Sequence, residues 1–165
     1  MFFNFIFRVL RFFNWVSDAI HRFDSEALVT VGTWNWKSGS NKCWGCFNLY
    51  TDECMKRAGG KDKGTLDFYQ MHTYEWLDET PLKKKADFYG LDRPLIIGEF
   101  SVKRSGGIDA ATAYKHYYFG GYNGALAWQY NDHNDNDRDS RDVINKGMSA
   151  IRNEHSNGEI KVIIN

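Results

Sequence analysis

Short apolar runs recur along the chain at spacings that suit alternating strands and helices. Each run is nearly continuous in apolar residues, which is typical of parallel strands that are covered on both faces. The runs start 39, 28 and 30 residues apart, which leaves room for a crossover helix between neighbours. The pattern therefore predicts a parallel α/β sheet with strands at residues 27–32, 66–71, 94–98 and 124–128.

The beginning of the chain predicts a helix over residues 7–22. Apolar side chains recur there at roughly helical spacing, namely Val9, Phe12, Phe13, Val16 and Ile20. A targeting segment is the alternative, but Arg8 and Arg11 interrupt the apolar run, and neither a basic n-region nor a small-residue cleavage site accompanies it. The run is also too short and too charged to span a bilayer. We therefore find no convincing signal peptide.

Two further helices are expected in the second half of the chain, each marked by a capping signal. They are residues 109–119, ended by Gly120 and Gly121, and a helix from Asp139 or Ser140 to about Arg152. The gap at residues 38–63 is rich in Gly, Lys, Asn and Cys, so we expect a loop with one helical turn around residues 52–57. The tail at residues 159–164 has no assigned role.

Strand–helix units that follow one another without a linker indicate one domain over residues 1–165. Four such units make half of a (β/α)8 barrel, which takes about 250 residues when complete. A doubly wound open sheet is the alternative. It requires a Gly-rich phosphate turn after the first strand, and the segment from Gly32 to Trp36 does not resemble one. We therefore expect an incomplete barrel.

Each apolar run is followed by residues that suit a binding site better than a core. They are Trp34 and Trp36 after the first run, His72 and Tyr74 after the second, Glu99 after the third, and Trp128, Gln129 and Tyr130 at the end of the fourth. In a parallel barrel the C-terminal strand ends lie on one face, where barrel enzymes hold their active sites. The sequence thus predicts a site that combines a carboxylate, an imidazole, a phenol and several indoles.

Glu99 follows directly on an apolar strand, between Gly98 and Phe100. A carboxylate is costly to bury unless its charge is needed or paired. One interpretation is a strand-end Glu that faces solvent or pairs with Lys103 or Arg104. The other is a nucleophile that attacks the anomeric carbon of a sugar and forms a glycosyl-enzyme intermediate.

The residues near Glu99 also have two interpretations. Tyr74 could hydrogen-bond Glu99 and keep it ionised and oriented, while His72 could contact substrate or position the acid/base. Alternatively, Tyr74 and His72 are a satisfied pair at the mouth of a barrel. Trp128 could stack on a sugar in the cleavage subsite, or it could fill the core of the last strand.

Composition narrows the partners without identifying the substrate. Lys and Arg together number 21, as do Asp and Glu, so the formal net charge is zero and gives no electrostatic footprint for nucleic acid or an anionic membrane. Aromatic residues are abundant, with 6 Trp, 9 Tyr and 12 Phe. Their rings suit the apolar faces of sugars but also fill cores. Our candidates for stacking on substrate are Trp34, Trp36 and Trp128.

We expect neither a metal site nor a cofactor. Cys43, Cys46 and Cys54 lack an evident fourth ligand for zinc, so one disulfide with one leftover thiol is the preferred interpretation. The Asp- and Asn-rich run at residues 131–139 resembles a calcium loop but lacks its central Gly and its Glu at position twelve. A solvated loop that ends in a helix N-cap explains it better.

Four segments resemble the C-terminal half of a glycoside hydrolase family 5 β-mannanase. They read ALVTVGTW, NLYTDECMKRAGGKDKGTLDFYQMHTYEW, RPLIIGEFS and GYNGALAWQY. The Gly-Glu-Phe motif is shared by a wider clan, whereas the segment that ends in His72-Thr-Tyr74 narrows the resemblance to mannanase-like members. FNWVSDAIH, which ends at His21, also resembles the family's fourth helix. The resemblance implies strands five to eight of a (β/α)8 barrel with their helices.

The same resemblance implies a secreted, retaining endo-hydrolase of β-1,4-mannan or a related polysaccharide. The family's nucleophile matches Glu99, its histidine and tyrosine on strand six match His72 and Tyr74, and its strand-eight tryptophan matches Trp128.

This chain departs from the family at the acid/base carboxyl. The family carries it in an Asn-Glu-Pro motif at the end of strand four, and this sequence has no Asn-Glu-Pro. Retention requires two carboxyl groups about 5–5.5 Å apart. We do not expect Glu75 or Asp78 to substitute, because the residue after Tyr74 faces away from it. The isolated chain is therefore expected to be nearly inactive, and a fragment of a longer protein or a truncated gene model explains it better than a new mechanism does.

An open half-barrel exposes strand edges and an inner apolar face. We therefore expect the chain to aggregate, to pair with a second copy or to complement a missing N-terminal half. Two alternatives to a hydrolase stay open. One is a non-catalytic carbohydrate-binding remnant, and the other is an unrelated α/β binding module, against which Glu99 and His72-x-Tyr74 at consecutive strand ends argue.

Overall fold

The computed structural model describes residues 2–33, 35–77, 80–129, 138–152, 155–156 and 160–161. The helices are α1 (Phe2–Phe23), α2 (Asp52–Gly59), α3 (Thr80–Lys83), α4 (Ala110–Phe119) and α5 (Arg141–Ile151), with short 3₁₀ helices η1 (Trp36–Gly39), η2 (Ala86–Tyr89) and η3 (Val102–Arg104). The strands are β1 (Gly32–Thr33), β2 (Tyr69–Thr73), β3 (Leu95–Phe100), β4 (Gly124–Ala127), β5 (His155–Ser156) and β6 (Ile160–Lys161).

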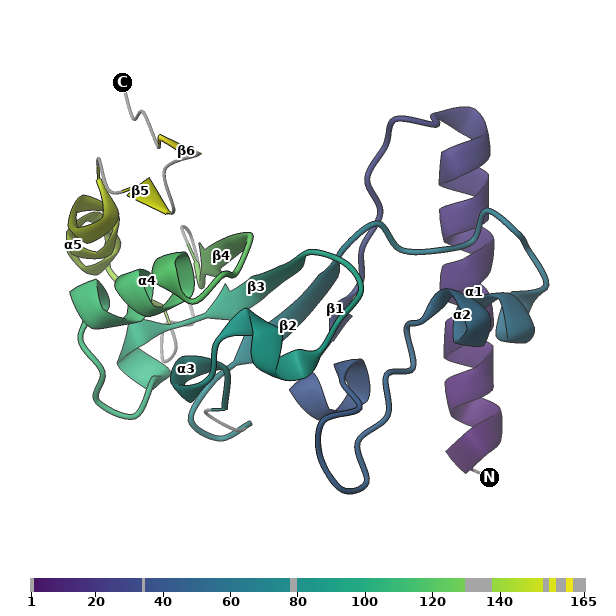
Figure 1. Cartoon of the computed structure of the whole chain (residues 1–165), viewed down its shortest axis with the longest axis horizontal. Coiled ribbons are helices and arrows are strands. Elements are labelled where there is room, and N and C mark those ends of the chain that lie inside the picture. Colours follow the sequence, from purple (N-terminus) through teal and green to yellow (C-terminus); the bar gives the residue numbers. More distant parts are fainter. Residues whose placement is uncertain are drawn as a thin grey trace.

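Strands β1 to β4 form one sheet in which every pair of neighbours runs parallel (Figure 1). Their order in the sheet, β1-β2-β3-β4, is also their order in the chain. A doubly wound sheet reverses its strand order part-way, whereas a barrel adds each strand beside the last. The predicted set of four parallel strands is therefore confirmed, and their order is that of consecutive barrel units.

The first two strands begin later than the apolar pattern predicts. Regular pairing is reduced to Gly32–Thr33 in β1 and starts only at Tyr69 in β2. The Asp67 backbone N–H donates to the Val29 carbonyl at 2.8 Å, but the Val29 N–H donates to the Asp67 carboxylate at 2.7 Å. Because a side chain takes the place of a backbone acceptor, the regular ladder begins after these residues.

The helices begin and end at capping residues. Asp109 caps α4 through its side chain, and Ser140, one of the two predicted N-caps, does the same for α5. Helix α2 is longer than the predicted single turn because Thr51 caps its start and Gly60, with φ 72°, ends it in the left-handed region that favours glycine. Helix α1 covers the predicted range and begins earlier, at Phe2. Within the described residues, none of the helices is long and apolar enough to cross a membrane.

The main core lies between the sheet and helix α4. Ile97 and Phe100 of β3 are fully buried, and the Phe100 ring meets Tyr114 and Tyr117 of α4 edge-on at centroid distances of 5.4 and 4.9 Å. A Cβ at Gly147 would overlap the ring of Tyr114, which explains why α5 carries a glycine where it packs on α4. Aromatic packing therefore holds the helices to this face of the sheet.

The opposite face of the sheet is much less covered. Side chains alternate between the faces of a strand, so Gln70, His72 and Ile96 lie opposite the buried Met71 and Ile97. All three are only partly buried. The near-continuous apolar pattern predicts that both faces of the sheet are covered. In the described residues only the face toward α4 is fully covered.

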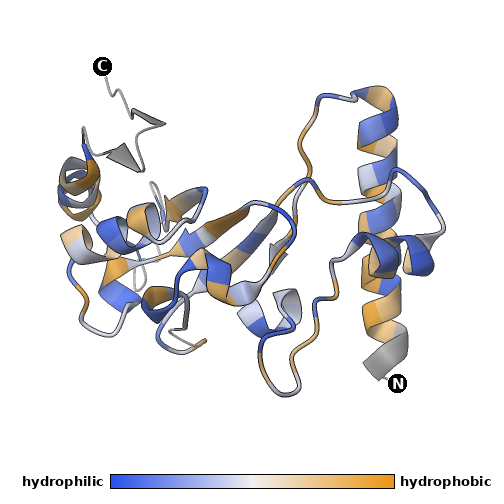
Figure 2. Cartoon of the chain, in the orientation of Figure 1, coloured by the Kyte–Doolittle hydropathy of each residue, from blue (hydrophilic) through white to orange (hydrophobic). Residues whose placement is uncertain are grey.

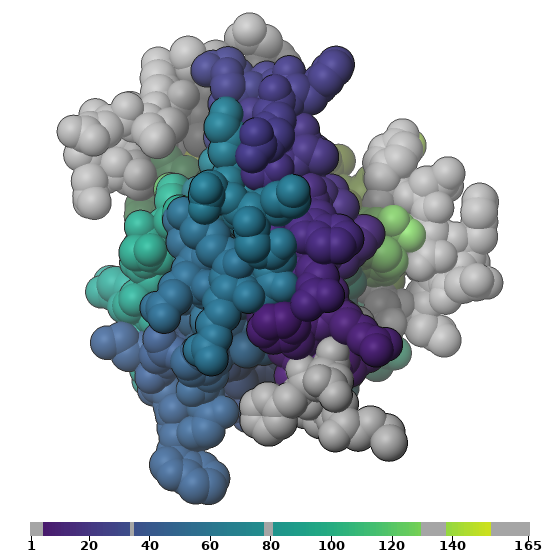
Figure 3. Space-filling model, turned by 90° about the vertical axis from the view of Figure 1, so that its right-hand side faces the viewer, coloured from purple at the N-terminus to yellow at the C-terminus, as the bar shows by residue number. Residues whose placement is uncertain are grey.

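A second, smaller core joins α1 to α2. It consists of Leu10, Met55, Ala58 and Leu66, and lies at the other end of the molecule from α5 (Figures 1 and 2). Figure 3 shows this end from outside, with α1 and the segment that contains α2 side by side. Partly buried residues such as Phe13 and Tyr50 pack against these four, and polar interactions also hold α1 against the segment that follows α2.

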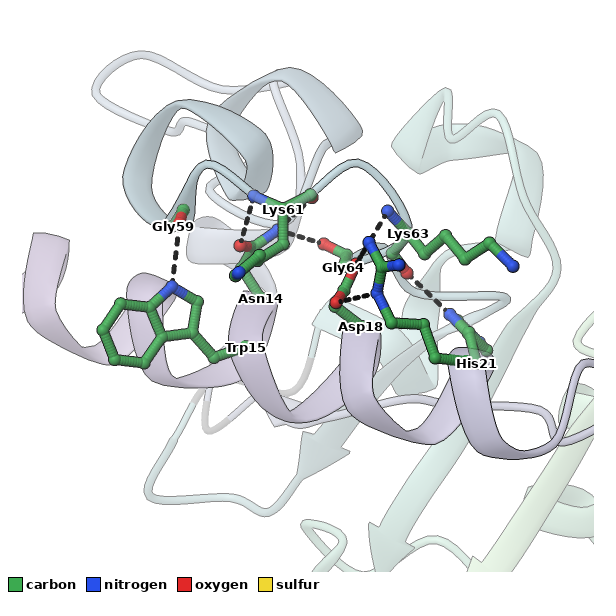
Figure 4. A network of polar contacts seen from close by, with 9 residues as sticks. Asn14, Trp15, Asp18, His21, Gly59, Lys61, Lys63 and Gly64 are labelled. Atoms are coloured by element: carbon green, nitrogen blue, oxygen red, sulfur yellow. Dashed lines mark hydrogen bonds and ion pairs between the residues drawn. The ribbon is translucent and has the colours of Figure 1, made fainter.

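A buried amide supplies those interactions. Asn14 is fully buried, and its Nδ2 donates to the carbonyls of Lys61 and Gly64, each at 2.8 Å, while its Oδ1 accepts from the Lys61 N–H at 3.1 Å (Figure 4). The Trp15 indole donates to the Gly59 carbonyl at 2.7 Å. A Cβ at Gly59 or Gly64 would overlap Asn14, so both glycines are needed for this close approach.

His21 extends the network to the start of the sheet. Its Nδ1 lies 2.7 Å from the Lys63 carbonyl and its Nε2 lies 2.9 Å from Asp67 Oδ2. The hydrogen bond to the Lys63 carbonyl, followed by the interaction with Asp67, raises the pKa of His21 above its ordinary value of 6.5. Asp67 also accepts from Val29, so one carboxylate connects α1 with the approach to β1.

Candidate active site

A break in strand register turns Glu99 toward the open face of the sheet. Met71 pairs with Ile97, but the next residue of β2, His72, pairs with Glu99, so Gly98 is an extra residue in β3. Without the extra residue, alternation would direct Glu99 to the buried side with Ile97. Bulges of this kind re-aim side chains next to active sites. Glu99 and His72 consequently share one face.

Two side chains from β2 and its end contact the Glu99 carboxylate. The Tyr74 hydroxyl donates a short hydrogen bond to Oε1, and His72 Nδ1 lies 3.3 Å from Oε2. The His72 contact is within ion-pair range but lacks hydrogen-bond geometry, so the buried Nδ1 has no hydrogen-bond partner in the described part of the chain. The Glu99 side chain is 20% exposed, so the carboxylate is hydrogen-bonded through one oxygen, has His72 beside the other and still reaches solvent.

The Tyr74 ring is itself supported by Trp76, a residue that the sequence analysis did not single out. The Trp76 ring stacks on Tyr74 with centroids 4.3 Å apart and planes 14° from parallel. The Arg104 guanidinium lies over Trp76 at 5.8 Å, and its Nη1 is 3.4 Å from Glu75 Oε1. The i, i+2 spacing of Tyr74 and Trp76 could have indicated the stack. Arg104, an alternative partner for Glu99 in the sequence analysis, here pairs with Glu75.

The three candidate tryptophans have different positions. Ala127 pairs with Phe100, so alternation places Trp128, the next residue, on the Glu99 side of the sheet, where it is partly buried. Trp36 is wrong as a stacking residue. It is 5% exposed in the core, with its ring edge-on to Tyr89 at 5.7 Å, so no ring face is open to a sugar. Trp34 and Tyr130 lie outside the described residues.

No group of three or more metal-ligating side chains occurs in the described part of the chain. Residues 131–137 of the calcium-like run lie outside it. Asp139 accepts from the Ser101 hydroxyl at 3.1 Å and from the Val102 and Lys103 N–H groups at 2.8 and 3.0 Å, so both of its oxygens are used to hold η3 beside β3. Cys43 and Cys46 form a disulfide and Cys54 is a free thiol, as preferred above.

The chain as a whole is similar to proteins that share one name, β-mannanase. No protein-family profile matches the chain. The chain is 41% identical over 160 residues to a mannan endo-1,4-beta-mannosidase of Cryptopygus antarcticus. The alignment covers 92% of this chain and 41% of that protein. The chain is a relative of the β-mannanases.

Solved β-mannanase structures share its fold. The endo-1,4-beta-mannanase of Eisenia fetida superposes with a TM-score of 0.86 at 35% identity, over 93% of this chain and 44% of the other. The beta-1,4-mannanase of Aplysia kurodai superposes with a TM-score of 0.81 at 40% identity, over 96% of this chain and 44% of the other. This β-mannanase relative thus spans less than half the length of the proteins it matches, and its sheet is part of a (β/α)8 barrel.

Proposed function

We propose that Glu99 is the nucleophile of a retaining hydrolase that cleaves β-1,4-mannan-type polysaccharides within a complete barrel. The observation that carries the proposal is the hydrogen bond from Tyr74 to Glu99 at the C-terminal ends of adjacent strands, with His72 beside the other oxygen. The relatives named above are β-mannanases, which supports mannan as the substrate class.

The geometry suits a double displacement. The hydrogen bond from Tyr74 orients the carboxylate, with His72 beside its other oxygen, so that one Glu99 oxygen bonds the anomeric carbon as the glycosidic C–O bond breaks. The departing oxygen takes a proton from a second carboxyl group. Water then attacks the same carbon, displaces Glu99 and returns a proton to that second group. Two inversions leave the configuration retained. Trp128, on the same face, is proposed to stack on the sugar at the cleavage site.

The second carboxyl group is not assigned to this chain. Glu75 is exposed and directed to Arg104, at 3.4 Å, rather than to Glu99. Asp78 lies outside the described residues. We therefore propose that the isolated chain hydrolyses mannan very slowly, because the leaving oxygen receives no proton from a placed acid.

A substrate that needs no acid tests the nucleophile directly. Fluoride leaves without protonation, so a 2-deoxy-2-fluoro-β-mannobiosyl fluoride should react with Glu99 and remain attached. We expect intact-mass analysis to show one added disaccharide and peptide mapping to find it on Glu99. Glu99→Gln should abolish labelling, and Tyr74→Phe should slow it. Glu75→Gln is the matched control and should label like the parent chain. A label on any other residue would remove Glu99 from the mechanism.

A binding-only role is the second candidate, because the sequence contains no Asn-Glu-Pro. In that case the fluoride would leave no label, while mannohexaose would still bind in calorimetry and lose affinity in Trp128→Ala. Labelling of Glu99 would decide for the hydrolase.

A further inference from the structure

Tyr74, which donates to Glu99, lies beyond the regular part of its strand. β2 ends at Thr73, so contacts other than the strand ladder must place Tyr74. The Leu77 N–H donates to the Tyr74 carbonyl at 3.0 Å, which closes a turn directly after the strand. This turn fixes the backbone of Tyr74, but it does not fix the tilt of the ring that carries the hydroxyl to Glu99.

The Trp76 indole supplies the missing constraint on that ring. The two rings are stacked, with centroids 4.3 Å apart and planes 14° from parallel, and such pairs are favourable beyond the area that they bury. An indole at this separation blocks movement of the phenol perpendicular to its own plane. That movement would carry the hydroxyl away from Glu99, so the stack helps to keep the hydrogen bond in place.

Trp76 is also connected to the part of the chain that carries Glu99. The Arg104 guanidinium lies over the indole, 5.8 Å from the ring centroid, and Arg104 belongs to η3, which follows β3. The Arg104 carbonyl accepts from the Glu75 N–H at 2.8 Å, at the residue between Tyr74 and Trp76. A backbone hydrogen bond and a ring contact therefore join the turn after β2 to the helix after β3.

The Glu75 side chain adds little to this connection. Its Oε1 lies 3.4 Å from Arg104 Nη1, and the two side chains are 40 and 36% exposed. Exposed ion pairs contribute little to stability. The backbone hydrogen bond of Glu75 does not depend on its side chain, so Glu75→Gln is a suitable control for labelling.

We propose that Trp76 is a positioning residue, which holds the Tyr74 phenol against the Glu99 carboxylate. The consequence for catalysis rests on the proposed function of Glu99 as nucleophile. Hydrogen bonds are directional, and small misplacements of a reacting group lower rates strongly. Without the indole, the phenol can tilt, and fewer molecules present the carboxylate in the orientation that attacks the sugar.

The rate at which the mannobiosyl fluoride labels Glu99 tests this role. A series of fluoride concentrations gives a limiting rate and a half-saturating concentration. Because the stack is lost, Trp76→Leu should lower the limiting rate roughly two- to tenfold and leave the half-saturating concentration unchanged. Trp76→Phe keeps a ring to stack and should recover most of the rate. Trp44→Leu, at a fully exposed loop position, is the matched control and should label like the parent.

The double variant separates positioning from a general loss of structure. If Trp76 acts through the Tyr74 hydroxyl, Trp76→Leu should not slow labelling further once Tyr74→Phe is present. Effects that multiply would overturn the proposal, as would an unchanged limiting rate in Trp76→Leu alone. A raised half-saturating concentration at an unchanged limiting rate would make Trp76 a sugar-binding residue instead. Trp76 is 48% exposed, so circular dichroism should show each variant folded, and Trp76→Gln replaces Trp76→Leu if it is not.

A measurement without substrate distinguishes failure of this inference from failure of the proposed function. With isotopically labelled tyrosine Cζ, the Tyr74 signal is the one that Tyr74→Phe removes from the NMR spectrum. Glu99→Gln should shift this signal in the parent, because it changes the acceptor of the phenol, and should shift it less in Trp76→Leu. An equal shift in both backgrounds would overturn the proposal even if Glu99 is labelled. If the parent is not labelled, the nucleophile assignment fails, and the shifts still decide whether Trp76 holds the phenol.

Discussion

The sheet region and the α1–α2 region of this molecule are held together by different forces. In the sheet region, fully buried Ile97 and Phe100 pack against aromatic rings of α4, and apolar contact is continuous. In the α1–α2 region the buried apolar cluster has four members, and Asn14 binds the backbone that follows α2 (Figure 4).

The difference shows what each region contributes. Apolar burial is strong but non-directional, so the sheet region gains stability and carries the candidate site at its strand ends. Hydrogen bonds to backbone carbonyls are weaker in net free energy but directional. They fix the position of α1 against the segment that follows α2. Stability and placement are thus provided by different parts of the chain.

The largest effect is expected from Phe100→Ala. The substitution leaves a cavity beneath α4 and removes the edge contacts to Tyr114 and Tyr117, so the free energy of unfolding should fall by about 3–5 kcal/mol. Urea unfolding followed by circular dichroism measures the change. Phe119→Ala, about half exposed, should alter it by less than about 0.5 kcal/mol. Equal effects from the two variants would show that the sheet region is not a packed core.

A smaller loss is expected from Asn14→Ala, which attacks the polar region. It leaves the Lys61 N–H and the Gly64 carbonyl without their side-chain partner and removes one of the two donors to the Lys61 carbonyl, at a cost of about 1–3 kcal/mol for a buried group. Hydrogen exchange of the Lys61 amide should accelerate more than that of β3 amides. Asn145→Ala, at an exposed site of α5, is the matched control. A change no larger than in Asn145→Ala would contradict the proposed role of the network.

The sequence predicts most of the fold but not two polar contacts between distant parts of the chain. The apolar runs locate four strands, and the stop at Gly120 and the N-cap at Asp139 or Ser140 locate two helices, because these signals are local. The late start of β2 depends on Asp67 binding Val29 from a distant part of the chain. The buried Asn14 depends on Gly59 and Gly64, 45 and more residues away. No local pattern reveals such pairs.

The candidate site likewise contains residues that the sequence predicts and residues that it does not. Residues placed by strand ends, namely Glu99, His72 and Tyr74, come together because neighbouring parallel strands end at the same edge. The expectation for Trp36 is wrong because η1 follows β1 closely and carries the ring under the loop into the core. Trp76 was missed because its partner is another aromatic ring rather than an ionisable group.

The disulfide should add modestly to the sheet region. Cys43 and Cys46 lie three residues apart and pack against the main core, so the loop that they close is very short. Loop-closure entropy for so few residues gives roughly 2 kcal/mol or less. Cys43→Ser should lower the midpoint of urea unfolding slightly and make it insensitive to reductant. Cys54→Ser is the control, and the parent's response to reductant should persist in it.

The smallest effect is expected from pH, and it should be confined to the α1–α2 region. Both ring nitrogens of His21 face acceptors, the Lys63 carbonyl and the Asp67 carboxylate, and only protonated imidazole can donate to both. The pKa of folded His21 is raised above 6.5. The contribution of His21 to stability is therefore complete below pH 6.5 and is lost as pH rises through the folded-state pKa.

The melting temperature of the parent relative to His21→Gln measures this contribution, since Gln does not titrate. The difference should be largest in mildly acidic buffer and should shrink as pH rises. A difference that grows with pH would mean that neutral His21 stabilises the fold more than protonated His21 does. Neutral His21 would then donate a single N–H, to Asp67. Since Asp67 also binds Val29, loss of the His21 contact should loosen the approach to β1 before it affects β3. Hydrogen exchange at Val29 and at Ile97 can separate the two regions in one experiment.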